Sequence, residues 1–104
     1  MIDTPIAIVW EFAVPAANRE RFEAAYGPGG DWARLFRHAA EFIGTELLRD
    51  RERKGLYLTI DRWASADAFD RFKRDFGADY ERLDAALEGL ADRETRLGLF
   101  DVSG

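Results

Sequence analysis

The chain has no cysteine and only one histidine among its 104 residues. Without thiols it has no disulfide framework, no thiolate nucleophile and no zinc–thiolate site. One histidine is too few for a centre that holds its metal through several imidazoles. The sequence therefore predicts no metal site.

Basic residues are not in excess either, since 15 Lys and Arg stand against 20 Asp and Glu and give a formal net charge of −5. The basic residues are scattered among acids, whereas nucleic-acid binding relies on basic patches. No run approaches the roughly 18 apolar residues of a membrane span, and the N-terminus lacks the basic start of a signal peptide. We expect a cytoplasmic protein with no nucleic-acid and no membrane partner.

The length fits a single domain over residues 1–104. Branched and aromatic residues mark four strand candidates, at 6–14, 42–50, 56–64 and 95–102. Apolar stripes at helical spacing mark helices between the first two and between the last two, with Ser65 as an N-cap. The order predicts an α+β fold of the ferredoxin-like β-α-β-β-α-β type, with an antiparallel four-stranded sheet.

Gly27-Pro28-Gly29-Gly30 is a glycine-rich run without the spacing of a phosphate loop or a dinucleotide fingerprint. We interpret it as a corner between two helices, in which Gly27 takes the left-handed conformation and Asp31 caps the next helix. A mobile pocket rim is the alternative.

The two faces of the predicted sheet differ in polarity. One is nearly all apolar and should lie under the helices; its members are Ile8, Trp10, Phe12, Leu58, Ile60, Leu97 and Leu99. The other mixes the two kinds of side chain, among them Glu11, Tyr57, Thr59, Asp61, Trp63 and Phe100. A second copy of the chain would cover the mixed face and could enclose a ligand cavity.

These features resemble the antibiotic-biosynthesis-monooxygenase-like family of the dimeric α+β-barrel superfamily. The resemblance rests on the WEF strand, the corner Tyr-Gly-Pro-Gly-Gly-Asp-Trp, GTELLRD and YLTIDRWAS, and covers about residues 6–102. It implies a homodimeric barrel with a pocket between each sheet and its helices or at the dimer face. Characterised relatives include cofactor-independent oxygenases of polyphenolic aromatics, haem-degrading enzymes and small-quinone oxidases.

The haem-degrading relatives use an Asn on the first strand, a Trp at the end of the third and a His on the following helix. Trp63 matches the Trp, but residues 6–14 contain no Asn and residues 65–90 contain no His. Without this histidine the haem iron would have no axial ligand. Haem degradation is therefore set aside.

The resemblance favours an oxygenase or oxidoreductase that acts without a cofactor on a small aromatic or polyphenolic metabolite. For catalysis we single out Trp63 as an aromatic wall, with Glu11 and Asp61 as an acid or base of raised pKa. Each has a structural alternative: core packing for Trp63, and ion pairs at the dimer seam for the two carboxylates. If the two faces of the sheet are reversed, Trp10 takes the place of Glu11 at the cavity. Tyr57, Thr59, Trp32 and Phe100 are the predicted ligand-pocket residues. The alternative function is a non-catalytic dimer that binds a small ligand.

Overall fold

The computed structural model describes residues 4–103, with four strands and four α-helices in that range. The strands are β1 (Ile6–Ala13), β2 (Phe42–Arg49), β3 (Leu56–Trp63) and β4 (Arg93–Asp101). The helices are α1 (Arg19–Tyr26), preceded by the 3₁₀ turn η1 (Ala16–Asn18), then α2 (Asp31–Phe36), α3 (Ala66–Asp75) and α4 (Gly77–Leu87). The predicted β-α-β-β-α-β order is confirmed, and each α position holds two consecutive helices.

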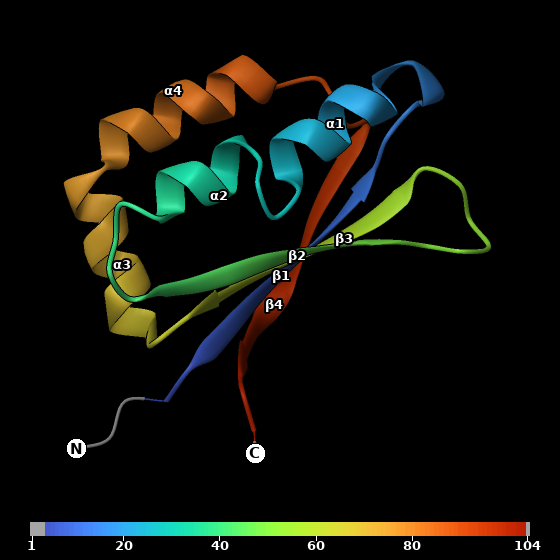
Figure 1. Ribbon diagram of the computed structural model, residues 1–104. Coiled ribbons are helices and arrows are strands. Elements are labelled where there is room, and N and C mark those ends of the chain that lie inside the picture. The colour runs from blue at the N-terminus through green and yellow to red at the C-terminus, as the bar shows by residue number, and fades with distance from the viewer. Residues whose placement is uncertain (1–3, 104) are drawn as a thin grey trace.

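The four strands form one antiparallel sheet in the order β2-β3-β1-β4. Figure 1 shows α1, α2 and α4 above one face of this sheet, with α3 at its end. The opposite face carries no helix of the described residues. This is the α+β arrangement expected from the sequence, with a helix-covered face and an open face.

The pairing of β1 with β3 decides which side chains lie under the helices. Trp10 stands opposite Thr59, and Phe12 stands opposite Tyr57. Directly opposed residues of an antiparallel pair share a face. Trp10 and Phe12 lie under the helices as predicted, but on β3 the odd-numbered residues join them. The prediction that Leu58 and Ile60 lie under the helices is therefore wrong.

Strand β4 also departs from the expected pattern. Its register against β1 shifts between Val9 and Trp10, where a bulge inserts an extra residue. Leu97 and Leu99 remain 46% and 45% exposed, so they do not belong to the core under the helices. Within residues 4–103, β2 and β4 are the edge strands of the sheet.

Two apolar clusters fill the space between sheet and helices. The larger one surrounds Trp63 and Phe72, and the smaller one consists of Phe12, Val14, Phe22 and Tyr57. Ser65 caps α3 as predicted, because the backbone N–H of Ala68 donates to its Oγ at 3.1 Å. This cap starts α3 two residues after the end of β3.

The glycine-rich run forms the predicted corner between α1 and α2, but not in the predicted way. Gly27 is extended, with φ −75°, and the N-cap of α2 is Gly30 instead of Asp31. A Cβ on Gly30 would stand 2.5 Å from the carbonyl oxygens of Ala24 and Ala25. Glycine is therefore required here by close packing against the end of α1, not by a left-handed conformation.

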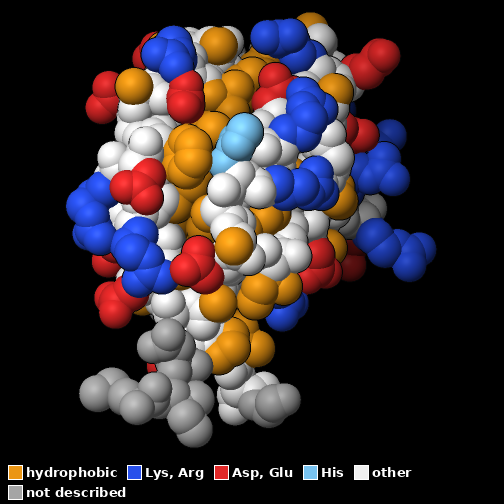
Figure 2. Space-filling view, turned by 60° about the vertical axis from the view of Figure 1, so that its left-hand side comes forward, with side chains coloured by type: hydrophobic (Ala, Val, Ile, Leu, Met, Phe, Trp, Pro, Cys, Tyr) orange, Lys and Arg blue, Asp and Glu red, His pale blue; other side chains and the backbone are white. Residues whose placement is uncertain are grey.

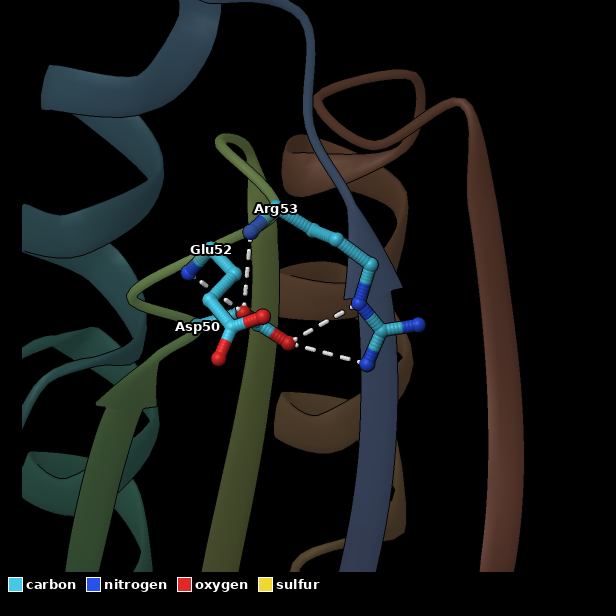
Figure 3. A network of polar contacts seen from close by, with 3 residues as sticks. All are labelled: Asp50, Glu52 and Arg53. Atoms are coloured by element: carbon cyan, nitrogen blue, oxygen red, sulfur yellow. Dashed lines mark hydrogen bonds and ion pairs between the residues drawn. The ribbon is translucent and has the colours of Figure 1, made fainter.

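The turn between β2 and β3 is closed by the Asp50 carboxylate, as Figure 3 shows. One of its oxygens accepts the backbone N–H groups of Glu52 and Arg53 at 2.8 and 2.9 Å. The other pairs with the Arg53 guanidinium at 2.9 Å. Gly55, with φ +85°, supplies the left-handed residue that returns the chain into β3.

Acidic and basic side chains alternate on the face shown in Figure 2, where the histidine lies beside an apolar strip. The His38 ring stacks on Phe76 with centroids 5.5 Å apart.

In the described part of the chain no helix has both the length and the apolar character needed to cross a membrane.

Candidate functional site

A cavity of about 230 Å³ lies between the helix-covered face of the sheet and helices α1, α2 and α4. The strands contribute Trp10, Phe12, Thr45, Thr59, Asp61 and Glu94 to its lining. The helices contribute Tyr26, Trp32, Phe36, Tyr80 and Asp84. Its wall is therefore mostly aromatic, with a few polar groups at fixed places.

The aromatic wall is held by contacts between its own members. The Trp32 ring lies 4.9 Å from Tyr80, 5.7 Å from Phe36 and 6.4 Å from Tyr26, measured between centroids. Tyr26 lies 5.0 Å from Phe12 in turn. Such tilted and stacked contacts order the rings, and they present flat apolar surfaces to a planar ligand.

Asp61 is the most perturbed acid of the cavity. The Thr45 hydroxyl on β2 donates to its Oδ1 at 2.6 Å, and Oδ2 has no hydrogen-bond partner among residues 4–103. Burial raises the pKa of Asp61 to about 6, although the bond from Thr45 acts in the opposite direction. A carboxylate with a pKa near neutrality exchanges a proton readily, which suits a general base.

Two further carboxylates, Asp84 on α4 and Glu94 on β4, stand at the exposed rim of the cavity. The pKa of Glu94 is raised by burial and also by the negative charges of Asp84 and Glu88. None of the described residues that line the cavity is a Lys or an Arg. The cavity is therefore acidic from its floor to its rim.

The two tyrosines of the lining stay protonated at neutral pH. Burial raises the pKa of Tyr26 to about 12; the nearby Trp32 indole opposes this, while Glu94 and Asp84 add to it. Burial and then Asp84 raise the pKa of Tyr80 as well. Both hydroxyls are therefore donors as well as acceptors for a bound molecule.

Of the residues singled out from the sequence, Asp61, Thr59 and Trp32 lie together in this cavity. Tyr57 does not line it. Tyr57 is buried, and its hydroxyl donates to the Glu23 carboxylate at 2.5 Å. The structure thus brings three of the seven residues to one place.

Trp63 and Glu11 do not line the cavity, and the expectation that they share it with Asp61 is wrong. The Trp63 side chain is completely buried, and its ring centroid lies 5.5 Å from that of Phe36, which lines the cavity while Trp63 does not. Glu11 stands opposite Leu58 and therefore lies on the open face of the sheet.

Phe100 also lies outside the cavity. It stands opposite Ala7 on the open face and is 49% exposed. The two errors on β1 and β4 have one cause. Polarity alone does not tell the two faces apart, because the helix-covered face carries polar residues where the cavity is.

Several cavity residues were missed, and some left a signal in the sequence. Tyr80 and Asp84 are four residues apart on one helix, so they share a face. Trp10 and Glu11 are neighbours on β1 and point to opposite faces of the sheet. Because the cavity lies on the helix-covered face, Trp10 lines it and Glu11 does not. Thr45 and Glu94 left no signal, because their contribution depends on strand register.

Residues 5–75 match the sequence model of the antibiotic biosynthesis monooxygenase family. A mutant of SnoaB, a cofactor-independent oxygenase from Streptomyces nogalater, is 26% identical, with a TM-score of 0.73 over 97% of this chain and 95% of that one. A Caulobacter crescentus protein named for the same family is 21% identical, with a TM-score of 0.78 over 99% of this chain and 93% of that one. No curated protein matches the sequence.

Proposed function

The chain belongs to the antibiotic biosynthesis monooxygenase family, and from the chemistry of its cavity we propose that it oxygenates a small phenolic aromatic without a cofactor. The observation that carries this proposal is Asp61, a half-buried carboxylate of raised pKa inside an aromatic cavity. The likeness to the cofactor-independent oxygenase SnoaB supports the same class of reaction.

The volume of the cavity limits the size of the substrate. An apolar cavity of about 150 Å³ holds one benzene ring, and this cavity measures about 230 Å³. It therefore suits one or two fused rings. A larger ring system would have to extend through the rim, past Asp84 and Glu94. We take 1-naphthol as the probe for this substrate class.

Asp61 would act first as a base. Its free Oδ2 takes the phenol proton, and the resulting anion gives an electron to dioxygen. Recombination of the two radicals forms a C–O bond para to the phenol oxygen, and Asp61 returns its proton to the peroxide. Loss of the proton on that carbon then breaks the O–O bond, and the departing hydroxide takes up a proton as water. In total, one naphthol and one dioxygen give one 1,4-naphthoquinone and one water.

The aromatic wall has two tasks in this sequence. It excludes water from the carbanion-like anion and holds the ring flat against Trp32 and Phe12. The hydroxyls of Tyr26 and Tyr80 remain protonated and donate to the developing carbonyl oxygen.

We further propose that the active protein is a homodimer that covers the open face of the sheet. Leu48 and Phe100 on this face are 43% and 49% exposed, and Leu58 and Ile60 lie between them. An apolar surface of this kind favours a partner. Because the cavity is on the other face, each protomer would keep a complete cavity.

The test is oxygen consumption by chelator-treated protein with 1-naphthol. Asp61→Asn removes the base and should lower kcat by about 10²–10⁴-fold, with little change in the binding of naphthol. Glu81→Gln, an exposed carboxylate on α4 that does not line the cavity, is the matched control and should retain full activity. Binding of naphthol without oxygen uptake would contradict the oxygenase proposal and favour a ligand-binding protein.

A further inference from the structure

We propose that the cavity selects its ligand by charge: it accepts aromatics that carry hydroxyl or ammonium donors and rejects aromatics of the same shape that carry a carboxylate. This rests on the proposed function only in that it concerns the same cavity. Binding can be measured without turnover, so the two proposals can fail separately.

The first observation is the placement of three carboxylates on three different elements. Asp61 projects from β3 into the interior, while Asp84 on α4 and Glu94 on β4 stand at the rim. A ligand that enters must pass the rim pair and then lie near Asp61. An anion meets negative charge at each stage, in a largely apolar cavity whose low effective dielectric constant screens charge less than water does.

The second observation is the absence of a compensating cation among the described lining residues. Arg96 and Lys73 line a separate groove, which shares Trp10 and Tyr80 with the cavity. The Lys73 ammonium is occupied there, 5.4 Å from the centroids of the Phe69 and Tyr80 rings. A carboxylate in the cavity would therefore find no basic partner among the described lining residues.

The third observation is that the acids already act on one another. Asp84 contributes to the raised pKa of Glu94, and Asp84 and Asp61 both contribute to that of Tyr80, where Arg96 opposes them. Glu88 adds to the effect on Glu94 from outside the lining. The field in the cavity is therefore negative before any ligand binds.

The hydrogen-bonding groups point to the same ligand chemistry. Oδ2 of Asp61 has no partner among the described residues, and it can accept a bond from a hydroxyl or an ammonium group. A ligand carboxylate has no proton to give at neutral pH and would leave this oxygen unpaired. Unpaired buried acceptors weaken binding strongly.

The experiment compares three probes with the same ring system and substituents of similar size: 1-naphthylmethylamine, 1-naphthalenemethanol and 1-naphthoate. Their Kd values are measured by calorimetry on the full chain at pH 8 and low salt. We expect the alcohol and the amine to bind at least tenfold more tightly than the carboxylate. A carboxylate that binds within tenfold of the alcohol would overturn the charge selection, while leaving the oxygenase proposal intact. If none of the three probes binds, the proposal that this cavity binds aromatic ligands is itself overturned.

Variants then identify the source of the selection. The double variant Asp84→Asn with Glu94→Gln should lower the ratio of the carboxylate Kd to the alcohol Kd at least threefold. The matched control is Glu20→Gln with Glu81→Gln, which removes the same charge from exposed positions outside the cavity. This control should leave the ratio of the two Kd values unchanged. An equal decrease of the ratio in both double variants, or no decrease in the first, would overturn the inference.

Discussion

Replacing Asp61 with asparagine should stabilise the protein at alkaline pH, and the gain should shrink as the pH falls below about 6. Burial raises the pKa of Asp61 from 3.8 to about 6. A raised carboxyl pKa means that the folded state disfavours the charged form, so stability falls as pH rises from about 4 to about 6 and then stays level. The shift of about 2 units corresponds to about 3 kcal/mol at pH 8 and about 1 kcal/mol at pH 4.5.

The assay is urea unfolding of the wild type and Asp61→Asn at both pH values. Asparagine has nearly the same shape and can still accept the Thr45 hydroxyl at its Oδ1. Its free energy of unfolding should therefore exceed that of the wild type by about 3 kcal/mol at pH 8 and by about 1 kcal/mol at pH 4.5. Asp75→Asn on the exposed end of α3 controls for the removal of one negative charge.

A gain that is the same at both pH values would refute the reasoning, because it would not come from ionisation of Asp61. A loss of stability at pH 8 would do so as well. If the gain appears, the protein keeps a charge that costs it stability in a place where it contacts a cavity. Such a trade-off is expected of a functional residue.

Three further predictions concern the core, the corner and the open face. Trp63→Ala should cost about 3–5 kcal/mol in urea unfolding, because it empties a fully buried site; Trp63→Phe should fold and cost less, and equal stability of all three proteins would contradict this. Gly30→Ala should lower the melting temperature because its Cβ would meet backbone carbonyls at 2.5 Å, whereas Gly29→Ala, with nothing within 4 Å, should not; equal effects would count against the corner geometry. Glu11→Gln should leave the Kd for 1-naphthalenemethanol unchanged, since Glu11 lies on the open face. A tenfold higher Kd would show that Glu11 contacts the ligand.

The fold could be predicted from the sequence because its signals are local. Alternating branched and aromatic residues marked each strand to within a few residues, and Ser65 marked the start of α3 by the chemistry of its hydroxyl. Gly27 was placed at the right corner with the wrong conformation, because the constraint comes from the approach of a second helix at Gly30. Contacts between elements leave no local signal.

The site could be predicted only in part because it depends on strand register. Asp61 and Thr59 were found as polar residues of one strand, but their partners on β1 were assigned to the wrong parity. The assignment assumed that the most apolar positions face the helices, and a cavity reverses that assumption locally. Trp63 was ambiguous in principle, since a buried tryptophan that packs a core and one that lines a cavity have the same neighbours in sequence.

The central claim is that this cavity joins dioxygen to a small phenol, and turnover of 1-naphthol under ¹⁸O₂ tests it most directly. We expect one dioxygen to be consumed per 1,4-naphthoquinone formed, with one labelled oxygen in the quinone and the other in water. Label is to be read before the carbonyls exchange with solvent, on protein treated with chelator. Quinone without label, or oxygen uptake no faster than with Asp61→Asn, would contradict the account.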